Sequence, residues 1–365
     1  QVNVAYRWFL GLGLTDKVPD ASTLSQNRIR RFKESDVYQQ IFDEIVLQAM
    51  KKKLVSGTTL YTDSTHLKAN ANKNKHIKVQ AQTERQAYMD ELDKSVEQDR
   101  LDHGKKPLAS RSEAPNKSRE IKQSTTDKDS GYMVRDNKPK GFFYLDHRTV
   151  DARCNIITDV HVTAGNVHDS VPYLARLDRQ VQRFGFNLQH VGLDAGYFTA
   201  ALCKGIEDRN LYGVMGYRRP THKKGYFYKN QYVYDETQDL YTCPQGQNIF
   251  YRTTTREGYR QYHSDANVCQ HCPDLTRCTN SQNHTKVITR HVWEDSKDRI
   301  NEHRLTDKGK ILYARRKETV ERSFADAKQL HGYRYAQFRG KHKVQMQCLM
   351  TAAAQNMKKI ALMAA

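Results

Sequence analysis

The chain has 365 residues, enough for one large core with one or two smaller modules. Its 60 Lys and Arg against 41 Asp and Glu leave a formal charge of +19, a field that attracts polyanions. The longest apolar stretches are only a few residues, which excludes a membrane-spanning protein. Because residue 1 is Gln1 rather than methionine, we expect the true N-terminus to lie upstream.

Residues 1–54 are predicted to form an N-terminal helical domain. Residues 5–12 have helical apolar spacing, and Ser22 or Thr23 can cap a second helix with a basic exposed face. The basic residues of that helix are Arg28, Arg30 and Arg31. Two short basic helices beside a Gly/Pro turn are typical of a helix-turn-helix, or equally of a helical brace on the main core.

A mixed α/β core is predicted to follow an amphipathic helix over residues 36–53. Its first strand, residues 58–63, is rich in β-branched and aromatic residues. The later elements are strands at 141–145, 155–162, 188–194 and 211–215, and helices at 170–184 and 199–210. Antiparallel strands followed by a strand, a helix and a strand are typical of a ribonuclease H-like α/β fold, a mixed sheet flanked by helices.

Residues 70–125 interrupt this core and are dominated by Asn, Lys, Gln, Glu, Arg and Asp. They carry only a thin apolar stripe, made of Tyr88, Met89, Leu92 and Val96. We expect an inserted, largely solvated arm. Such a charge run is usually a polar surface, but in a basic protein it can also lie along a nucleic-acid backbone.

Four cysteines with metal-ligand spacing lie in a segment predicted as a small insertion, residues 218–300. They are Cys243, Cys269, Cys272 and Cys278. The two-residue gap in the central pair lets both thiolates reach one tetrahedral zinc ion. The pattern lacks the second CxxC pair of a regular zinc ribbon, so a reduced cluster without metal is the alternative. His263, His271 or His284 could also replace one thiolate.

Three carboxylates lie where a ribonuclease H-like core would direct them at one place. Asp63 closes the first strand, Asp194 closes a later apolar strand, and Glu321 lies in a strongly helical stretch. Carboxylate oxygens can bridge two divalent cations, Mg²⁺ or Mn²⁺, while leaving positions open for phosphate and water. The sequence therefore predicts a catalytic two-metal site at these residues.

Glu318 and Asp326 are rival third ligands on the same predicted helix. We prefer Glu321 because Lys317, four residues before it, and Lys328, seven residues after it, would share its face and hold phosphates. The chain has no G-x-x-x-x-G-K-[ST] phosphate loop, which is consistent with chemistry that needs no ATP.

Short motifs spread over nearly the whole chain carry a resemblance to a known family. They are RWFLGL from Arg7, PDASTL from Pro19, TDST from Thr62, NVHDS from Asn166, GLDAGY from Gly192, CPQG from Cys243, and V-E-x-x-F-x-x-x-K from Val320. Together they resemble the DDE transposases of bacterial insertion sequences, specifically the group with an N-terminal helical domain and a cysteine-bearing insert.

The resemblance implies a ribonuclease H-like fold whose Asp, Asp and Glu fall on Asp63, Asp194 and Glu321. Related transposases surround the Glu with a Tyr-x-x-Arg-x-x-x-Glu-x-x-x-x-x-x-Lys signature. Here Lys328 keeps the register, but Lys317 takes the Arg position, while the Tyr and Arg of the signature stand one residue early, at 313 and 316.

The domains implied are an end-binding unit, 1–54, a catalytic domain in two parts, 55–217 and 301–365, and the insertion between them. The implied activity is metal-dependent cleavage of element ends and strand transfer into target DNA. The candidate DNA contacts are Arg28, Arg30, Arg31, Arg316, Lys317, Lys328 and Arg339.

The resemblance also implies double-stranded DNA as the partner, a homodimer on that DNA, and a cytoplasmic, nucleoid-associated protein of a bacterium. Two alternatives stay open. One is a nuclease of the same fold that lacks strand transfer, and the other is a catalytically inactive DNA-binding protein derived from a transposase.

Overall fold

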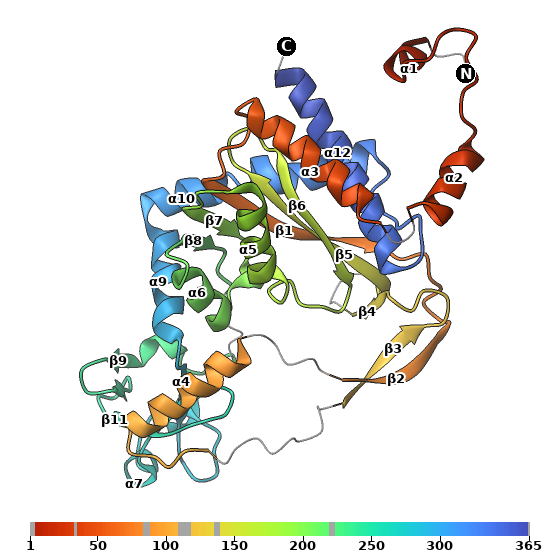
Figure 1. Ribbon diagram of the computed structural model, residues 1–365. Helices are drawn as coiled ribbons and strands as arrows, with labels where there is room; N and C mark the ends of the chain where they lie inside the picture. Colours follow the sequence, from red (N-terminus) through yellow and green to blue (C-terminus); the bar gives the residue numbers. More distant parts are fainter. Residues whose placement is uncertain are drawn as a thin grey trace.

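A six-stranded mixed sheet lies at the centre of the structure (Figure 1), a computed structural model that describes residues 4–32, 35–82, 88–108, 118–134, 139–218 and 223–363. Its strands are β1 (Thr59–Lys68), β4 (Gly131–Met133), β5 (Gly141–Asp151), β6 (Ile157–Ala164), β7 (His190–Leu193) and β8 (Tyr212–Met215). The order across the sheet is β6, β5, β1, β7, β8, and β4 pairs with the start of β5. β1 is antiparallel to β5 and parallel to β7, so it joins an antiparallel half to a parallel half.

Helices pack around this sheet and bury its middle strands. They are α3 (Val37–Lys51), α5 (Tyr173–Phe184), α6 (Ala200–Glu207), α9 (Glu294–Leu305), α10 (Asp307–Ala314), α11 (Arg322–Leu330) and α12 (Lys341–Met363). α3 and α12 pack on each other and on β6, whereas α9 and α10 pack on β8. Every residue of β5 is buried, because helices cover both of its faces.

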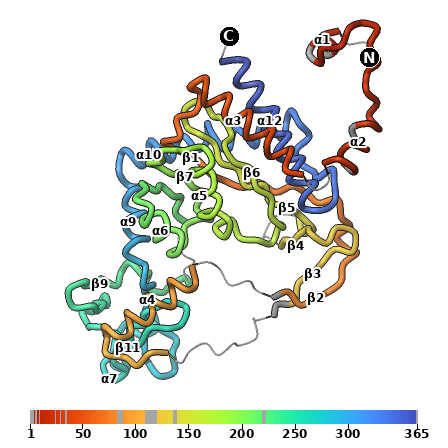
Figure 2. The backbone as a smooth tube through the Cα atoms, viewed as in Figure 1, coloured from red at the N-terminus to blue at the C-terminus, as the bar shows by residue number. Residues whose placement is uncertain are grey.

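The N-terminal helices divide into a packed part and an extended part. α3 places Phe42 and Val46 in the main core, although it lies within the expected N-terminal unit. α1 (Val4–Phe9) and α2 (Ala21–Arg30) extend away from the core (Figure 2). The predicted cap was wrong: α2 begins at residue 21, so Ser22 and Thr23 lie inside the helix.

The first strand is longer than its sequence pattern indicates. β1 continues past Asp63 because β5 pairs with it as far as Lys68, opposite Phe143. Asp63 therefore lies in the middle of β1, and the expectation that it closes the strand was wrong. The polar residues after it belong to a strand because tertiary pairing outweighs local propensity.

Most described residues of the polar arm are exposed or half-buried, as expected, yet the arm is folded. β2 (His76–Gln82) and β3 (Ser118–Ser124) form an antiparallel ribbon, and α4 (Met89–Asp102) lies between them in the chain. α4 buries Leu92 and Val96 against Trp293, at the end of the insertion. Its Asp99 carboxylate accepts a hydrogen bond from Arg260 Nε (2.6 Å). The arm and the insertion therefore support each other.

Residues 233–291, within the predicted insertion, form their own five-stranded antiparallel sheet, in the order β13, β12, β11, β10, β9. The elements of the insertion are η2 (Lys229–Gln231), β9 (Val233–Asp235), β10 (Leu240–Thr242), β11 (Asn248–Thr254), β12 (Tyr259–His263), α7 (Ala266–Cys269), α8 (Leu275–Cys278) and β13 (Val287–His291). A small aromatic core that includes Tyr241 and Tyr262 holds the sheet together. The insertion thus has a hydrophobic core separate from that of the central sheet.

Arg148 fastens two C-terminal helices to the central sheet. It lies on β5 and donates from Nε to Asp146 Oδ2 (2.8 Å), within the same strand. Its Nη1 donates to Ser323 Oγ of α11 (3.0 Å) and to Gln355 Oε1 of α12 (2.8 Å). Both members of the ion pair are fully buried, so neither charge can turn to water if its partner is lost.

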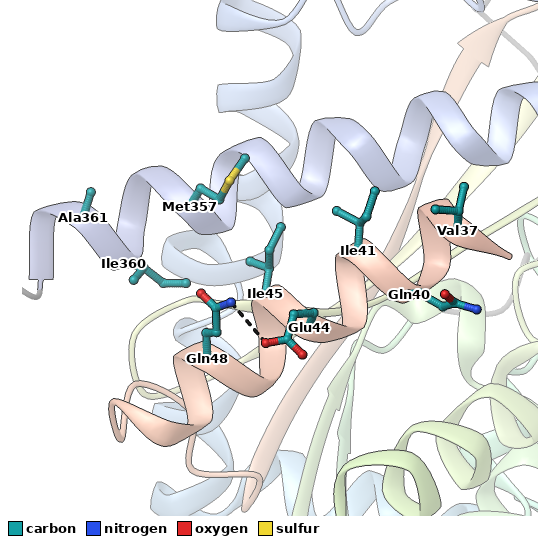
Figure 3. A pocket seen from close by; sticks show the side chains of 9 residues that line it. All are labelled: Val37, Gln40, Ile41, Glu44, Ile45, Gln48, Met357, Ile360 and Ala361. Atoms are coloured by element: carbon teal, nitrogen blue, oxygen red, sulfur yellow. Dashed lines mark hydrogen bonds between the residues drawn. The ribbon is translucent and has the colours of Figure 1, made fainter. Parts of the chain in front are cut away.

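An apolar groove of about 620 Å³ runs between α3 and α12 (Figure 3). Ile41 and Ile45 of α3 line it opposite Met357 and Ile360 of α12. Among the described helices, none is both long and apolar enough to cross a membrane.

Arg148→Met should lower the free energy of unfolding by about 3–5 kcal/mol, because it leaves the Asp146 carboxylate buried without its cation. Urea unfolding of the full chain, followed by circular dichroism, measures the change. Arg209→Met is the matched control, since Arg209 pairs with the more exposed Asp178 and its loss should cost less than about 1 kcal/mol. Equal losses in the two variants would contradict the clamping role of Arg148.

Candidate active site

Three carboxylates that are far apart in the sequence converge on the guanidinium group of Arg316. Nη2 of Arg316 lies 2.9 Å from Asp63 Oδ2, while Nη1 lies 3.5 Å from Asp194 Oδ1 and 3.7 Å from Glu321 Oε1. The side chains of Asp194 and Glu321 are 50% and 46% exposed, whereas that of Arg316 is 5% exposed. The three predicted residues therefore share one place, open to solvent on one side and closed by a buried cation on the other.

Parallel pairing of two strands brings the aspartates together. Thr62 of β1 pairs with Leu193 of β7, and Asp63 and Asp194 are the next residues along each strand. Since neighbours in a parallel pair run in the same direction, the two aspartates lie side by side. β7 ends there and the chain turns into η1 (Ala195–Tyr197), so the edge of β1 beyond Thr62 has no β7 partner.

Glu321 reaches the site through a π-helical turn, η3 (Lys317–Glu321). The backbone N–H of Glu321 donates to the carbonyl oxygen of Arg316, five residues back (3.2 Å). The signature of related transposases has one residue fewer between its Arg and Glu, and a π turn accommodates such an extra residue inside a helix. Arg316 therefore faces the carboxylates although it stands one position early.

This turn corrects one sequence interpretation. The spacing assigns Lys317 to the signature Arg position and to the face of Glu321, but its side chain is exposed and Arg316 lies in the site instead. Arg316 is also a predicted DNA contact, and in the folded chain its guanidinium is buried against carboxylates.

Tyr313 gives Arg316 a neutral partner. Nη1 of Arg316 donates to Tyr313 Oη (3.3 Å), and the guanidinium lies 5.3 Å from the centre of the ring. A Cβ atom at Gly216, just beyond β8, would lie only 2.5 Å from Tyr313 Oη. A glycine is therefore needed at residue 216 for the tyrosine to reach the arginine.

The rival carboxylates point elsewhere. Asp326 accepts a hydrogen bond from Arg322 Nε on the same helix (3.1 Å). Glu318 is exposed, and its backbone carbonyl accepts a hydrogen bond from Asn155 (3.1 Å). Neither makes an ion pair with Arg316 among the described contacts, so the geometry favours Glu321 as the third member of the cluster.

Asp63 is the least hydrated of the three carboxylates. Burial raises the pKa of Asp63 to about 6, although Arg316 and a hydrogen bond from the Ser64 backbone lower it. The nearby charges of Asp194 and Asp169 raise the pKa further. Added positive charge beside Asp63 would therefore favour its ionised form.

Sequence reasoning missed Asp169 and Ser64 as members of the site. Ser64 donates from its backbone N–H to Asp63 Oδ1 (2.8 Å) and from its hydroxyl to Asp169 Oδ1 (2.7 Å). Asp169 thus orients the residue next to Asp63. The signal was present, because Asp169 belongs to the NVHDS motif that contributed to the resemblance.

The remaining candidate DNA contacts differ in how exposed their side chains are and in what their charged groups contact. Arg30 and Arg31 are exposed at the end of α2. The guanidinium of Arg28 instead lies over the ring of Phe338 (4.9 Å), in the loop before α12. Arg339 donates to the backbone carbonyl of Asn70 (3.0 Å), and Lys328 is half-buried on α11.

The four cysteines of the insertion line one small cavity of about 40 Å³. They are Cys243, Cys269, Cys272 and Cys278, and all four are free thiols. The backbone N–H of Gln247 donates to Cys243 Sγ (3.4 Å), and Tyr232 Oη lies 3.2 Å from Cys278 Sγ. Burial raises the pKa of the Cys278 thiol.

Within the described residues, no group of three or more histidine, cysteine, aspartate or glutamate side chains is arranged so that it could hold a metal ion. At the carboxylates Arg316 occupies the space between the ligands. The donor chemistry nevertheless suits metals, with hard oxygens in one cluster and soft thiols in the other.

Two family models match the chain, one at each end. Residues 242–361 match a family described as a transposase DDE domain, and residues 1–30 match Transposase domain (DUF772). A comparison with curated proteins gives no significant match. The DDE match includes the four cysteines and Glu321, whereas Asp63 and Asp194 lie outside it. Both matches are to transposase models, and together they support an insertion-sequence DDE transposase.

Proposed function

We propose that this transposase cleaves the ends of its element and transfers them into target DNA at a centre formed by Asp63, Asp194 and Glu321. The observation that carries the proposal is the convergence of these carboxylates within 3.7 Å of one guanidinium group. Clustered carboxylates that are partly open to solvent are the ligands that Mg²⁺ or Mn²⁺ would take, with positions left for water and phosphate.

The order of the central strands supports a ribonuclease H-like fold for this catalytic domain. The sheet runs third, second, first, fourth, fifth in chain order when β4 is set aside, and of these five strands only the second runs opposite to the first. Residues 55–217 and 301–365 would form the domain, and residues 218–300 the insertion within it. Such a core places carboxylates from distant segments beside the first strand, which is where Asp63 lies.

The chain's own residues would divide the work of the reaction. Asp63, anchored in a buried strand, would fix one side of the metal-binding centre, while Asp194 and Glu321 would close it from the solvent side. Two bound divalent cations would supply Lewis acidity to the attacking and leaving oxygens. The same centre would serve first a water nucleophile and then the freed 3′-hydroxyl, so neither ATP nor a covalent enzyme intermediate is required.

Binding of double-stranded DNA is expected of the family, and several basic residues suit contacts to it. We assign recognition of the element ends to residues 1–54, with Arg30 and Arg31 toward the DNA. Lys317, Lys328 and Arg339 would contact phosphates nearer the centre. Bringing two ends together would require a homodimer on DNA, and the substrate places the protein at a bacterial nucleoid.

The cysteine cavity is proposed to hold a structural zinc ion. Four thiols around one small cavity match the number and softness of ligands that tetrahedral zinc prefers. The N–H group of Gln247 that points at Cys243 would stabilise a thiolate. With all four ligand positions filled by protein, the ion would support the insertion and take no part in the chemistry.

Glu321→Gln should reduce cleavage of a labelled duplex that bears the element end by roughly 100-fold or more, because one anionic metal ligand is lost. The assay uses Mg²⁺ or Mn²⁺ and resolves the cleaved strand on a gel. Glu318→Gln is the matched control on the same turn and should cleave at the parent rate. Unchanged cleavage by Glu321→Gln would remove this residue from the centre. Binding without cleavage by the parent would instead indicate an inactive relative, and hydrolysis without strand transfer a simple nuclease.

The full chain, purified without chelators, should contain about one zinc ion per molecule by elemental analysis. Cys272→Ser should lower that content, since it removes one ligand, whereas Cys154→Ser, outside the insertion, should not. Chelation should also lower the melting temperature of the parent, because the ion holds the insertion together. A parent protein free of zinc, with the same melting curve after chelation, would exclude this site.

A further inference from the structure

Arg316 occupies an unusual position for a basic residue in a positively charged, DNA-binding chain. Its side chain is 5% exposed, and its two terminal nitrogens face three carboxylates at 2.9, 3.5 and 3.7 Å. Nε is buried and has no hydrogen-bond partner among the described residues. The side chain is therefore held mainly by the anionic cluster and by Tyr313, and it does not lie exposed on the surface.

The helix geometry commits this side chain to the cluster. Arg316 immediately precedes the π turn, and the Glu321 N–H donates to its carbonyl oxygen. Its two terminal nitrogens lie within 3.7 Å of the carboxylates and are buried, while the side chains of Asp194 and Glu321 remain about half exposed. A solute cation would thus approach from the open side and meet the guanidinium between its ligands.

Electrostatics makes the guanidinium and divalent cations competitors. Three carboxylates this close repel one another, and a buried positive charge offsets that repulsion in the metal-free chain. The same charge repels an incoming divalent cation, and it also holds ligand oxygens that the cation needs. Both effects lower the affinity of the free protein for metal.

We propose that Arg316 is an internal counter-cation that holds Asp63, Asp194 and Glu321 together in the metal-free protein and must leave them for divalent cations to bind. This inference rests on the proposed function, because it takes the three carboxylates to be the metal ligands. Arg316 is then a positioning residue, and its charge sets the concentration of divalent cation that is needed to fill the site. The π turn keeps the arginine and Glu321 on one face of the helix. Glu321 can therefore release the arginine and bind a metal ion without a movement of the helix.

Arg316→Gln should bind Mn²⁺ about tenfold or more tightly than the parent in the absence of DNA, as measured by isothermal titration calorimetry. The metal-free variant should also melt at a lower temperature than the parent, and Mn²⁺ should raise its melting temperature more than it raises that of the parent. Arg316→Lys keeps the charge but cannot bridge three carboxylates, and should bind Mn²⁺ about threefold more tightly. If the Gln variant does not fold, the Lys variant decides.

Arg315→Gln is the matched control, because it removes the same charge from the neighbouring, exposed position and should bind Mn²⁺ like the parent. Equal or weaker Mn²⁺ binding in the Arg316 variants would overturn the counter-cation role. Glu321→Gln separates this result from failure of the centre itself. If Glu321→Gln abolishes Mn²⁺ binding and the Arg316 variants do not strengthen it, only the inference fails. If Glu321→Gln binds Mn²⁺ like the parent, the proposed centre fails, and the inference with it.

Discussion

The buried side chain of Arg148 joins the parts of the chain that must meet for the carboxylates to converge. Arg148 lies directly opposite Asp63 in the pairing of β5 with β1, and it donates to Ser323, two residues after Glu321. The guanidinium is further enclosed by the rings of Phe324 and Tyr333, at 4.9 and 4.8 Å. One arginine thus ties the strand pair that carries Asp63 to the helix that follows Glu321, although these residues are far apart in the sequence.

Buried arginines have distinct roles according to the anions that surround them. Arg148 faces Asp146 in a fully buried ion pair, and Arg176 of α5 donates from Nε to Asp159 of β6 (2.8 Å) on another part of the sheet. Both of these ion pairs are closed, in the sense that both partners are buried away from solvent, which suits a structural contact. Arg316 instead faces several carboxylates that are partly open to solvent. An open cluster can accept another cation, whereas a closed pair cannot do so without loss of packing.

The two long segments outside the core, the arm and the insertion, pack on each other. The arm contributes α4, whose Arg100 donates to the backbone carbonyl of Thr254 in the insertion (2.9 Å). His103 donates from Nε2 to Asp239 Oδ2 (2.7 Å), and its ring stacks on that of Tyr251 with 3.8 Å between the ring centres. These contacts hold one face of the helix against the insertion, while the rest of it stays exposed or half-buried.

Much of the site could be predicted from local sequence. Apolar strands ending near Asp63 and Asp194, and a helical stretch around Glu321, indicated a two-metal centre, and cysteine spacing indicated a thiol cluster. These features are local patterns, which periodicity and ligand spacing report directly. The NVHDS motif also contained Asp169, but nothing in the local pattern related that carboxylate to Ser64.

Only the tertiary structure decided how these local elements meet. Pairing with β5 extended β1 past Asp63, because strand length depends on a partner that lies some eighty residues away. α4 packs Leu92 and Val96 against Trp293, a long-range contact that the polar composition of the arm does not indicate. The π turn placed Arg316 rather than Lys317 among the carboxylates, and a one-residue change of helical register cannot be read from spacing alone. The sequence by itself determined which side chains could carry the chemistry. The fold decided which cation stands between them, since that depends on burial and on contacts between distant segments.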